Sequence, residues 1–408
     1  MPVHGTQRLA DEARLDDPAF YVQDPHPTYA RLRSEAPVFW YAPGGFWALS
    51  RYDDIARVSK DPVGFSTSRV SFVKDIAHVA KSAQRSQAGL TFAADPPDHA
   101  RYRGLVSRAF TPRTVRDLEP LIRDIVRATL DGLPSGAPVD VVETVSVPVS
   151  INVIAAMLGV PRADWDHFRR ATDAFVEAAD AVPGTEAAAR MQASVAEFLE
   201  YLDHQVAQRR AEPRDDLMTA IAMAELDGER LAPALQVQFC FNLLAAGNET
   251  TRNTLSAATV ALAEHPDQWR MIVADRGVAT SATEEVLRWT SVLHSFVRTA
   301  TQDTVIGDQE IAAGDFVAML YPSGNRDETQ WERADEFDVT REPRPTHLTF
   351  GVGPHFCVGA GLARLEIRVV LEELSARFAE LEPAGDGVRL PSTVVDRYAT
   401  VPVMLRRA

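Results

Sequence analysis

The run Phe350-Gly351-Val352-Gly353-Pro354-His355-Phe356-Cys357-Val358-Gly359 places one cysteine among spaced glycines, directly before a helix-like stretch over residues 360–378. Glycines let backbone N–H groups approach the sulfur where a Cβ would clash. The start of the following helix adds partial positive charge, which favours a thiolate over a thiol. The run therefore favours a thiolate ligand over a loop cysteine packed as a small hydrophobic residue.

The same run, followed by Leu362-Ala363-Arg364, resembles the haem-ligand loop of the cytochrome P450 family of haem-thiolate monooxygenases. By this resemblance Cys357 is the axial, metal-binding ligand of the haem iron. A thiolate in that position favours O–O cleavage, so the resemblance implies oxygen activation rather than oxygen carriage. It also implies a mainly α fold with minor β structure, in which a helical domain surrounds haem b beside a small N-terminal β-sheet region. One domain over residues 1–408 is expected.

Composition and charge narrow the class of protein. With 46% hydrophobic and 24% charged residues, the 408-residue chain is ordinary for a soluble globular protein. A net charge of −15 argues against nucleic-acid binding and against attachment to anionic lipid. Residues 1–17 are polar and acidic, and no run of about 18 apolar residues occurs, so we expect no signal peptide, no membrane anchor and a cytoplasmic location.

Cysteine usage agrees with this location. The chain has two cysteines, Cys240 and Cys357. If the second binds iron, the first has no partner for a disulfide, which fits a reducing compartment. Cys240 lies in the apolar stretch 237–246 and is expected to be buried.

Apolar periodicity predicts a helical middle flanked by short strands. A hairpin is expected over residues 37–41 and 45–49, and further strands over 304–306 and 316–320. Residues 66–91 are either a long loop or broken helices. The longest helix, 235–264, would be about 45 Å long. The other predicted helices cover residues 52–60, two segments within 97–130 divided at Thr111-Pro112, and residues 145–158, 165–178, 185–211, 214–225 and 282–289.

The long helix contains the polar string Ala246-Gly247-Asn248-Glu249-Thr250-Thr251. A glycine inside a helix costs roughly 1 kcal/mol relative to alanine, so Gly247 requires a reason, such as a close ligand. By the resemblance, this segment bends over the haem, Ala246 and Gly247 contact the cofactor, and Glu249 and Thr250 are catalytic groups that help to deliver protons to dioxygen. A threonine hydroxyl that bonds to the preceding turn would loosen the helix. The alternative is a packed glycine beside a solvated acid.

Glu285 and Arg288 lie three residues apart on one predicted helix. By itself such a pair is a surface ion pair that contributes a few tenths of a kcal/mol. By the resemblance the pair is buried and meets Arg341. Glu284 could also reach Arg288 at four residues' spacing, so the assignment to Glu285 depends on the resemblance.

Four basic residues are expected to bind the haem propionates. The segment 95–103 resembles the family segment in which His99 and Arg103 face one propionate, and Arg298 and His355 complete the set by the same resemblance. A guanidinium can hold a carboxylate through two hydrogen bonds. Phe350 is expected to contact the cofactor as well.

A basic stretch interrupts this acidic chain. Our hypothesis is that those of its arginines that do not face the haem form, with Arg364, a docking patch for an acidic electron donor. The donor would be a ferredoxin, supplied with electrons from NAD(P)H by a ferredoxin reductase. The alternative is an ordinary exposed helix. We expect a monomer. The arginines of the stretch are Arg101, Arg103, Arg108, Arg113 and Arg116.

The resemblance places the substrate pocket beside Ala245, Val292, Leu293 and Val394. These small and aliphatic side chains favour a bulky apolar substrate, such as a steroid, terpenoid or lipid. A hydroxylase or epoxidase acting on a macrolide or another secondary metabolite is the alternative. A peroxide-driven oxidase or a non-catalytic haem-binding protein has less use for Glu249 and Thr250. The family often has proline where Val292 stands. His294, close to it, is expected to face solvent from a loop, and the alternative is contact with a polar group of the substrate.

Overall fold

The computed structural model describes residue 9 and residues 11–79, 93–170 and 186–407. Its α-helices are α2 (His26–Glu35), α3 (Tyr52–Lys60), α4 (Ile76–Val79), α5 (Asp98–Ser107), α6 (Pro112–Asp117), α7 (Glu119–Asp131), α8 (Val147–Leu158), α10 (Glu186–Ala211), α11 (Leu217–Ala222), α12 (Pro233–Glu264), α13 (Pro266–Ala274), α14 (Ala279–Thr290), α15 (Tyr321–Gly324) and α16 (Ala360–Arg377). A π-helical turn, η4 (Val142–Ser146), precedes α8, and short 3-10 helices are η1 (Pro18–Tyr21), η2 (Val73–Asp75), η3 (Arg108–Phe110), η5 (Arg162–Asp164) and η6 (Arg276–Val278).

The strands form small sheets. They are β1 (Val38–Tyr41), β2 (Phe46–Leu49), β3 (Phe65–Ser66), β4 (Pro138–Asp140), β5 (Glu225–Leu226), β6 (Glu229–Arg230), β7 (Ser295–Ala300), β8 (Thr304–Ile306), β9 (Gln309–Ile311), β10 (Phe316–Leu320), β11 (Glu380–Pro383), β12 (Val388–Leu390), β13 (Arg397–Thr400) and β14 (Pro402–Arg406). The main sheet has the order β1-β2-β10-β7-β3, in which only β2 and β10 run parallel. A second sheet has the order β11-β14-β4.

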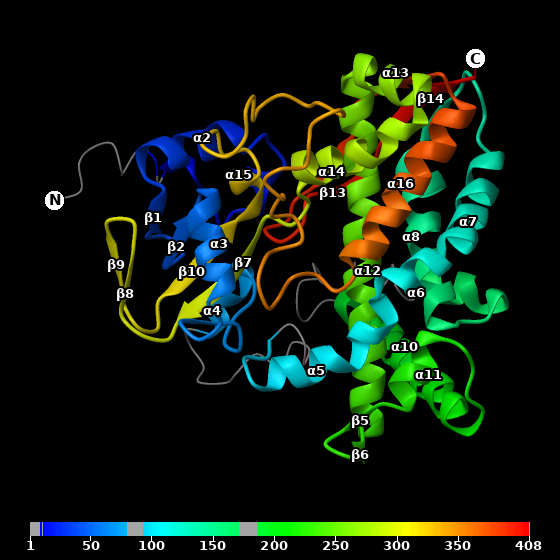
Figure 1. Cartoon of the computed structure of the whole chain (residues 1–408), viewed down its shortest axis with the longest axis horizontal. Coiled ribbons are helices and arrows are strands. Elements are labelled where there is room, and N and C mark those ends of the chain that lie inside the picture. Colours follow the sequence, from blue (N-terminus) through cyan, green and yellow to red (C-terminus); the bar gives the residue numbers. More distant parts are fainter. Residues whose placement is uncertain (1–8, 10, 80–92, 171–185, 408) are drawn as a thin grey trace.

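The longest helices gather on one side of the molecule, and the main sheet lies on the other side with α2, α3, α4 and α15 (Figure 1). Helix α12 runs through the helical side, about 48 Å long for its 32 residues. It begins with a proline in its first turn and ends before Pro266, two positions where proline is compatible with a helix boundary. Helices α8 and α16 pack against it, and their apolar faces share one large core. This arrangement holds the start of α16, which follows Cys357, against the middle of the molecule.

Several predictions of elements are confirmed. The hairpin forms with Trp40 opposite Trp47, and the helix over residues 52–60 and the strands over 304–306 and 316–320 have the expected bounds. The helices predicted over 145–158, 185–211, 235–264, 282–289 and 360–378 correspond to α8, α10, α12, α14 and α16. Cys240 is fully buried.

Other boundaries were wrong. Three helices, not two, occupy residues 97–130, because Thr111 caps α6, which starts at Pro112, and α7 begins at Glu119 with Pro120 in its first turn. The helix expected over 214–225 is shortened to α11, since Asp216 caps its start and the β5–β6 turn follows. Within 66–91, broken helices are found as far as Val79, and residues 80–92 lie outside the described part. The segment expected as a helix over 165–178 is helical as far as residue 170, where the description ends.

A network of ion pairs joins α7 to α16. Glu373, with only 7% of its side chain exposed, binds Arg123, Arg127 and Arg377 at 2.7–3.0 Å. Although burial would raise its pKa, hydrogen bonds from these three arginines lower the pKa of Glu373 to about 2. Since the folded state has the lower pKa, the network stabilises the fold above the unfolded pKa near 4.5, and this contribution is lost as the pH falls toward 2.

The substitution Glu373→Gln is therefore expected to destabilise the protein by about 1–2 kcal/mol at pH 7, allowing for the exposure of the arginines. The difference from the wild type should shrink as the pH is lowered through 4. Urea unfolding at pH 7 and at pH 3 measures both values. Glu200→Gln, at an exposed position of α10, is the control and should change neither value. A destabilisation by Glu373→Gln that is equal at both pH values would contradict the assignment.

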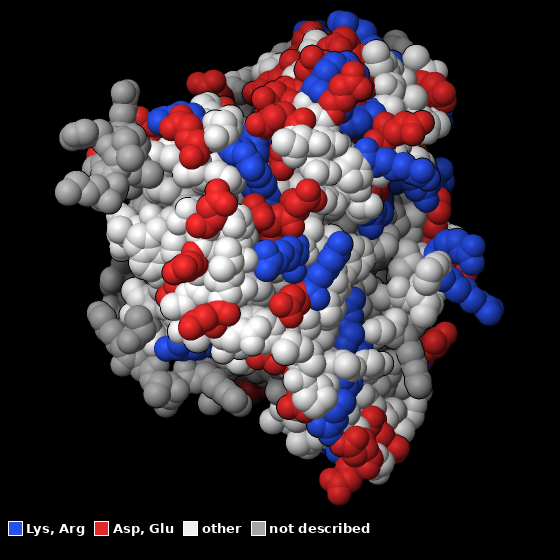
Figure 2. All heavy atoms as spheres, turned by 60° about the vertical axis from the view of Figure 1, so that its left-hand side comes forward, with Lys and Arg blue, Asp and Glu red and all other residues white. Residues whose placement is uncertain are grey.

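The surface carries both signs of charge. On the face shown in Figure 2, acidic and basic side chains are interleaved, and a narrow column of basic side chains runs down its lower part. The net charge of −15 is therefore compatible with local basic areas. Among the residues that the structure describes, no helix has the length and apolarity needed to cross a membrane.

Candidate active site

The loop before α16 is a tight turn with glycines at two positions whose backbone conformation other residues rarely adopt. Gly351 and Gly353 have φ values of +67° and +78°, in the left-handed region. A Cβ on Gly353 would lie 2.7 Å from the carbonyl oxygen of Ser59. The amide of Cys357 donates to the carbonyl of Phe350 at 2.9 Å, which closes the loop and fixes the backbone that carries the cysteine.

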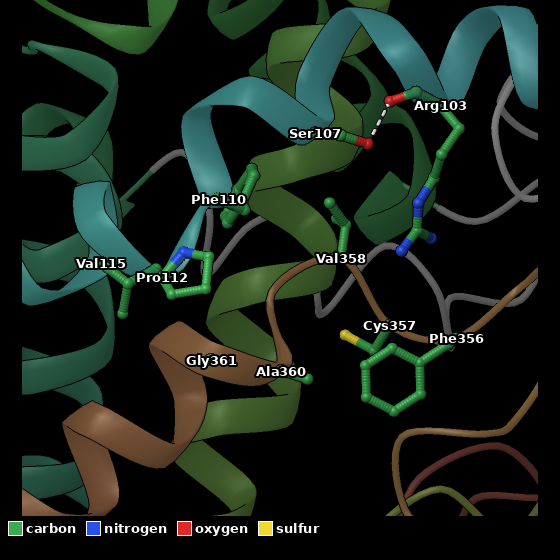
Figure 3. Close-up of a pocket in the computed structure, with 10 residues that line it drawn as sticks. All are labelled: Arg103, Ser107, Phe110, Pro112, Val115, Phe356, Cys357, Val358, Ala360 and Gly361. Carbon is green, nitrogen blue, oxygen red and sulfur yellow. Dashed lines mark hydrogen bonds between the residues drawn. The ribbon is translucent and has the colours of Figure 1, made fainter.

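Cys357 opens into a pocket of about 440 Å³ (Figure 3). The sulfur is accessible from this pocket, and Arg103 extends toward the loop from the other wall. Burial among protein atoms raises the pKa of the Cys357 thiol, whereas the backbone N–H groups of Gly359 and Ala360 and the guanidinium of Arg103 act in the opposite direction. The other residues that line the pocket are Ser107, Phe110, Pro112, Val115, Phe356, Val358 and Gly361.

Four basic side chains predicted from the sequence are brought together beside this loop. The rings of His99 and His355 are in contact, with centroids 4.0 Å apart and planes tilted by 35°, and each histidine is within electrostatic range of Arg103 and Arg298. Burial, reinforced by Arg298 and His99, lowers the pKa of His355 to about 3, and burial followed by the two arginines lowers that of His99. The four residues therefore form a cluster built around two guanidinium charges.

This cluster has the features of an anion site. The side chain of Arg298 is 5% exposed, and His355 Nε2 is buried without a hydrogen-bond partner among the described residues. The nearby carboxylate of Asp95 accepts hydrogen bonds from Ser66 and Thr67. One buried and one half-buried guanidinium group, with an orphaned ring nitrogen, are a donor set that carboxylates satisfy. Together with an accessible sulfur, they fit a haem with its two propionates.

Part of the polar string of α12 lies on a side of the helix that the rest of the protein does not fully cover. Ala245, Ala246, Glu249 and Thr250 are half-buried, whereas most of the helix from Thr251 to Ala263 is buried. The hydroxyl of Thr250 donates to the carbonyl of Ala246 at 2.7 Å, the bond to the preceding turn that the sequence predicted. The open face is where a small molecule can approach this helix.

Gly247 has a packing partner in the structure. A Cβ at this position would lie 3.4 Å from Ile154 Cδ1 of α8. Asn248, fully buried, accepts a hydrogen bond from Ser150 of the same helix at 2.9 Å. Close packing against α8 is therefore the contact that the structure gives for this glycine, and contact of Ala246 and Gly247 with a cofactor stays a prediction.

Glu249 is surrounded by cations from three elements. Arg397 of β13 lies 3.9 Å from its carboxylate, and Lys74 of η2 and Arg252 of α12 lie within electrostatic range. Burial raises the pKa of Glu249, and Arg252 and Lys74 oppose this shift. A carboxyl with a raised pKa takes up and releases protons closer to neutral pH than an ordinary glutamate.

Comparison with known proteins decides the family. The sequence model described as Cytochrome P450 matches residues 36–276 and 272–393. The chain belongs to the cytochrome P450 family. It is therefore a monooxygenase, an oxidoreductase of a family that uses haem and O2, and the expected mainly α fold with minor β structure is confirmed.

Its relatives include bacterial hydroxylases. Linalool 8-monooxygenase of Pseudomonas putida is 36% identical over 406 residues, which cover 96% of this chain and 98% of the relative. The methyl-branched lipid omega-hydroxylase of Mycobacterium tuberculosis is 36% identical over 389 residues, which cover 92% and 90%. The solved structure of cytochrome P450 CYP109Q5 from Chondromyces apiculatus matches with a TM-score of 0.85 at 36% identity and covers 97% of this chain and 98% of that one.

The P450's buried ion-pair cluster has the predicted composition. Arg288 binds both carboxylate oxygens of Glu285 at 2.8 Å, and Arg341 binds the same carboxylate at 3.1 Å. Glu284 turns the other way and binds Arg364 at 2.6 Å. The alternative in which Glu284 pairs with Arg288 is therefore excluded.

The P450's predicted pocket walls meet in space. Leu293 forms an isolated β-bridge with Val395, and the amide of Asp396 donates to the carbonyl of Val292 at 2.7 Å. Leu293 and Val394 are half-buried, as residues that line a cavity would be, while Val292 is 3% exposed and packs into the core. The structure thus joins the segment after α14 to the turn before β13.

The expectation for His294 was wrong. The residue is 4% exposed, and its ring stacks on Tyr21 with centroids 4.0 Å apart. Burial, with a smaller effect of Arg389, lowers the pKa of His294 to about 3, so the ring is neutral at physiological pH. Because the segment is extended, His294 faces away from its neighbour Leu293 and into the N-terminal segment.

The proposed docking arginines differ in their surroundings. Arg113 is 87% exposed and lies 3.9 Å from the carboxylate of Asp117, Arg116 is exposed, and Arg101 pairs with Asp98 and Asp227. Arg364 is held by Glu284 and lies over the ring of Phe350, so it does not extend the exposed patch. The description does not include the side chain of Arg108.

Sequence reasoning missed the cations around Glu249 and the partner of His294. Arg397, Lys74 and Tyr21 are each remote in sequence from the residue they meet. Single charged or aromatic residues in loops and short strands carry no periodic signal, so only the fold brings them to the site.

Proposed function

We propose that this P450 binds haem b through Cys357 and inserts one oxygen atom from O2 into a bulky, branched apolar molecule of the terpenoid or lipid type. The observation that carries the proposal is the accessible sulfur of Cys357 beside a cluster of two arginines and two histidines, of which His99 and Arg298 are buried and Arg103 and His355 half-buried. When bound, haem with a thiolate ligand supplies O2 activation. The protein supplies binding, orientation and protons.

The residues that hold the cofactor come from four parts of the chain. Cys357 supplies the thiolate, and Phe350 at the start of its loop lies beside the cofactor with Ala246 and Gly247 of α12. The propionates bind Arg103, Arg298, His99 and His355. The proposal explains why His355 Nε2 is buried without a partner among the described residues.

Proton delivery is assigned to Thr250 and Glu249. The Thr250 hydroxyl donates its proton to Ala246, so its oxygen lone pairs are left to accept a hydrogen bond from water or from a substrate oxygen. Glu249 directly precedes Thr250 in the sequence, is half-buried as Thr250 is, and has a raised pKa. It can take a proton from solvent and pass it inward.

The proposed substrate class is based on the residues predicted to line the pocket and on the names of two relatives. Ala245, Leu293 and Val394 offer apolar contact area, so binding depends on hydrophobic burial. Two relatives are named for linalool and for methyl-branched lipids. A branched, flexible hydrocarbon chain is the feature shared by these two names, and we carry it over to this P450.

Electrons are proposed to come from NAD(P)H through a ferredoxin reductase and a ferredoxin, to a monomeric P450. Arg113 and Arg116, exposed on α6, are the proposed contacts for the acidic donor. This surface lies on the same element as Val115, which lines the pocket beside Cys357. Electron entry there would be close to the sulfur.

Binding spectra followed by turnover test these proposals. Linalool-type alcohols and methyl-branched fatty acids are expected to perturb the Soret band at lower concentration than steroids or macrolides, and to give hydroxylated products with a surrogate ferredoxin, its reductase and NADPH. Tight binding and oxidation of a macrolide with no response to branched chains would overturn the substrate class.

Reversal of Arg113 and Arg116 to glutamate should slow the reduction of the P450 by ferredoxin, most strongly at low salt. Reversal of Arg270 and Arg276 elsewhere on the surface should not.

A further inference from the structure

We propose that Glu284 and Arg364 form a positioning pair that holds Phe350 against the cysteine loop and so stabilises the bond between the Cys357 sulfur and the haem iron. This inference rests on the proposed function, in which Cys357 is the iron ligand. It assigns a role to two residues that the sequence had placed elsewhere, one as an alternative partner of Arg288 and one in a docking patch.

The pair is specific in geometry. Arg364 Nε lies 2.6 Å from Glu284 Oε1 and its Nη2 lies 3.1 Å from Oε2, a two-point contact that fixes the plane of the guanidinium. Glu284 lies on α14 and Arg364 on α16, the helix that begins directly after the cysteine loop. The pair therefore ties the start of α16 to the helix that also carries the buried Glu285–Arg288 pair.

The held guanidinium acts on an aromatic ring of the loop. The Arg364 cation lies 4.6 Å from the ring centroid of Phe350, within range of a cation–π interaction. The carbonyl of Phe350 accepts the hydrogen bond from the amide of Cys357 at 2.9 Å. Three successive contacts thus connect the carboxylate of Glu284 to the backbone of the iron ligand.

His347 supports the pair without adding charge. Its Nε2 lies 3.4 Å from Glu284 Oε2, and its ring lies 5.5 Å from that of Phe350. Burial lowers the pKa of His347, which keeps the ring neutral. Glu284 keeps its negative charge, since hydrogen bonds from His347 and Arg364 outweigh the effect of burial and lower its pKa to about 2. The guanidinium of Arg364 is the cation of this group.

The exposure of the pair indicates positioning rather than core stability. The side chains of Arg364 and Glu284 are 28% and 18% exposed, whereas those of Glu285 and Arg288 are each 1% exposed. An ion pair in contact with solvent contributes little to global stability. The contact of Arg364 with Phe350, however, restricts the motion of the loop that carries the sulfur.

Three variants test the inference in the haem-loaded protein. Glu284→Gln leaves the cation of Arg364 free to move, Arg364→Met removes it at similar length, and Arg364→Lys keeps the charge without the planar fork. The matched control is Arg368→Met, on the same helix, with 27% of its side chain exposed and ion pairs to Glu372 and Glu119. Among the described residues, Arg368 makes no ion pair or cation–π contact with the cysteine loop, so the comparison isolates the contacts that Arg364 makes there.

The measurements are the half-life of the red-shifted Soret band of the reduced carbon monoxide complex in mild urea, and the reduction potential. Glu284→Gln and Arg364→Met should lose the band roughly two- to fivefold faster than Arg368→Met, the effect of losing one cation–π contact. Arg364→Met should also lower the potential, because a cation near the iron is lost, and Arg364→Lys should restore the potential but not the half-life.

Half-lives and potentials equal to those of Arg368→Met in both Glu284→Gln and Arg364→Met would overturn the positioning role and leave the proposed function intact. A red-shifted band that persists in Cys357→Ser would instead overturn the proposed function itself. If Arg364→Met fails to fold, the comparison of Glu284→Gln and Arg364→Lys with the control decides the same question.

Discussion

Replacing Thr250 by alanine is expected to leave NADPH consumption within about twofold of the wild type while it lowers the product formed per NADPH by about 10²-fold, the lower end of the contribution of a positioned proton donor. The missing electrons should appear as hydrogen peroxide. The reason is the hydroxyl on the open face of α12, which is anchored on Ala246 with its lone pairs free to accept a hydrogen bond. Without it, protons arrive from unpositioned water.

The matched control is Thr254→Ala. Thr254 makes the same bond one turn further along, to the carbonyl of Thr250 at 2.8 Å, but is buried. Thr254→Ala should change the product formed per NADPH little. Thr250→Ser should restore the coupling that Thr250→Ala loses. Product, NADPH and peroxide measured in one assay give the coupling directly. A Thr250→Ala enzyme with the coupling of the wild type would remove Thr250 from proton delivery.

The second large effect is expected for the buried ion-pair cluster. Glu285→Ala leaves Arg288, at 1% exposure, with its three backbone carbonyl partners but without its carboxylate. An uncompensated buried charge costs about 3–5 kcal/mol, which is a large part of the stability of most proteins. We therefore expect a variant that is mostly unfolded or without haem at 37 °C, and a strongly lowered midpoint in urea.

The exposed pair Arg333–Glu336, at 54% and 60% exposure, provides the control. Glu336→Ala should lower the free energy of unfolding by less than about 1 kcal/mol. The two variants are compared by urea unfolding of the apo and the haem-loaded protein, which separates stability of the fold from retention of the cofactor. If Glu285→Ala lowers the free energy of unfolding as little as Glu336→Ala does, the buried ion-pair cluster does not have this structural role.

The sequence predicted best those elements that are bounded by strong local signals. Helix α12 lies between Ala232 and His265 because prolines stand at both of its limits, and the β1–β2 hairpin turns at Pro43-Gly44-Gly45. The cysteine run was informative because two of its glycines, Gly351 and Gly353, adopt positive φ, a conformation that glycine favours more than any other residue type. The cluster of His99, Arg103, Arg298 and His355 was predicted only through the resemblance, because four separate basic residues have no shared local pattern.

What escaped prediction depends on tertiary contacts. His294 is buried because Tyr21, near the start of the chain, covers it. Arg364 faces Glu284 rather than solvent because α14 and α16 pack together, and Arg397 reaches Glu249 from a short strand near the end of the chain. In each case the sequence shows the residue, and only the fold determines which partner satisfies its charge or ring.

The central claim is that the sulfur of Cys357 is the anionic ligand of haem iron. The most direct measurement is the absorption spectrum of the purified, reduced, carbon monoxide-treated protein, compared with that of Cys357→Ser and of Cys240→Ser, the buried cysteine as control. The account predicts a strongly red-shifted Soret band in the wild type and in Cys240→Ser, and its loss in Cys357→Ser. A wild-type protein without this band, or a Cys357→Ser variant that keeps it, would contradict the account.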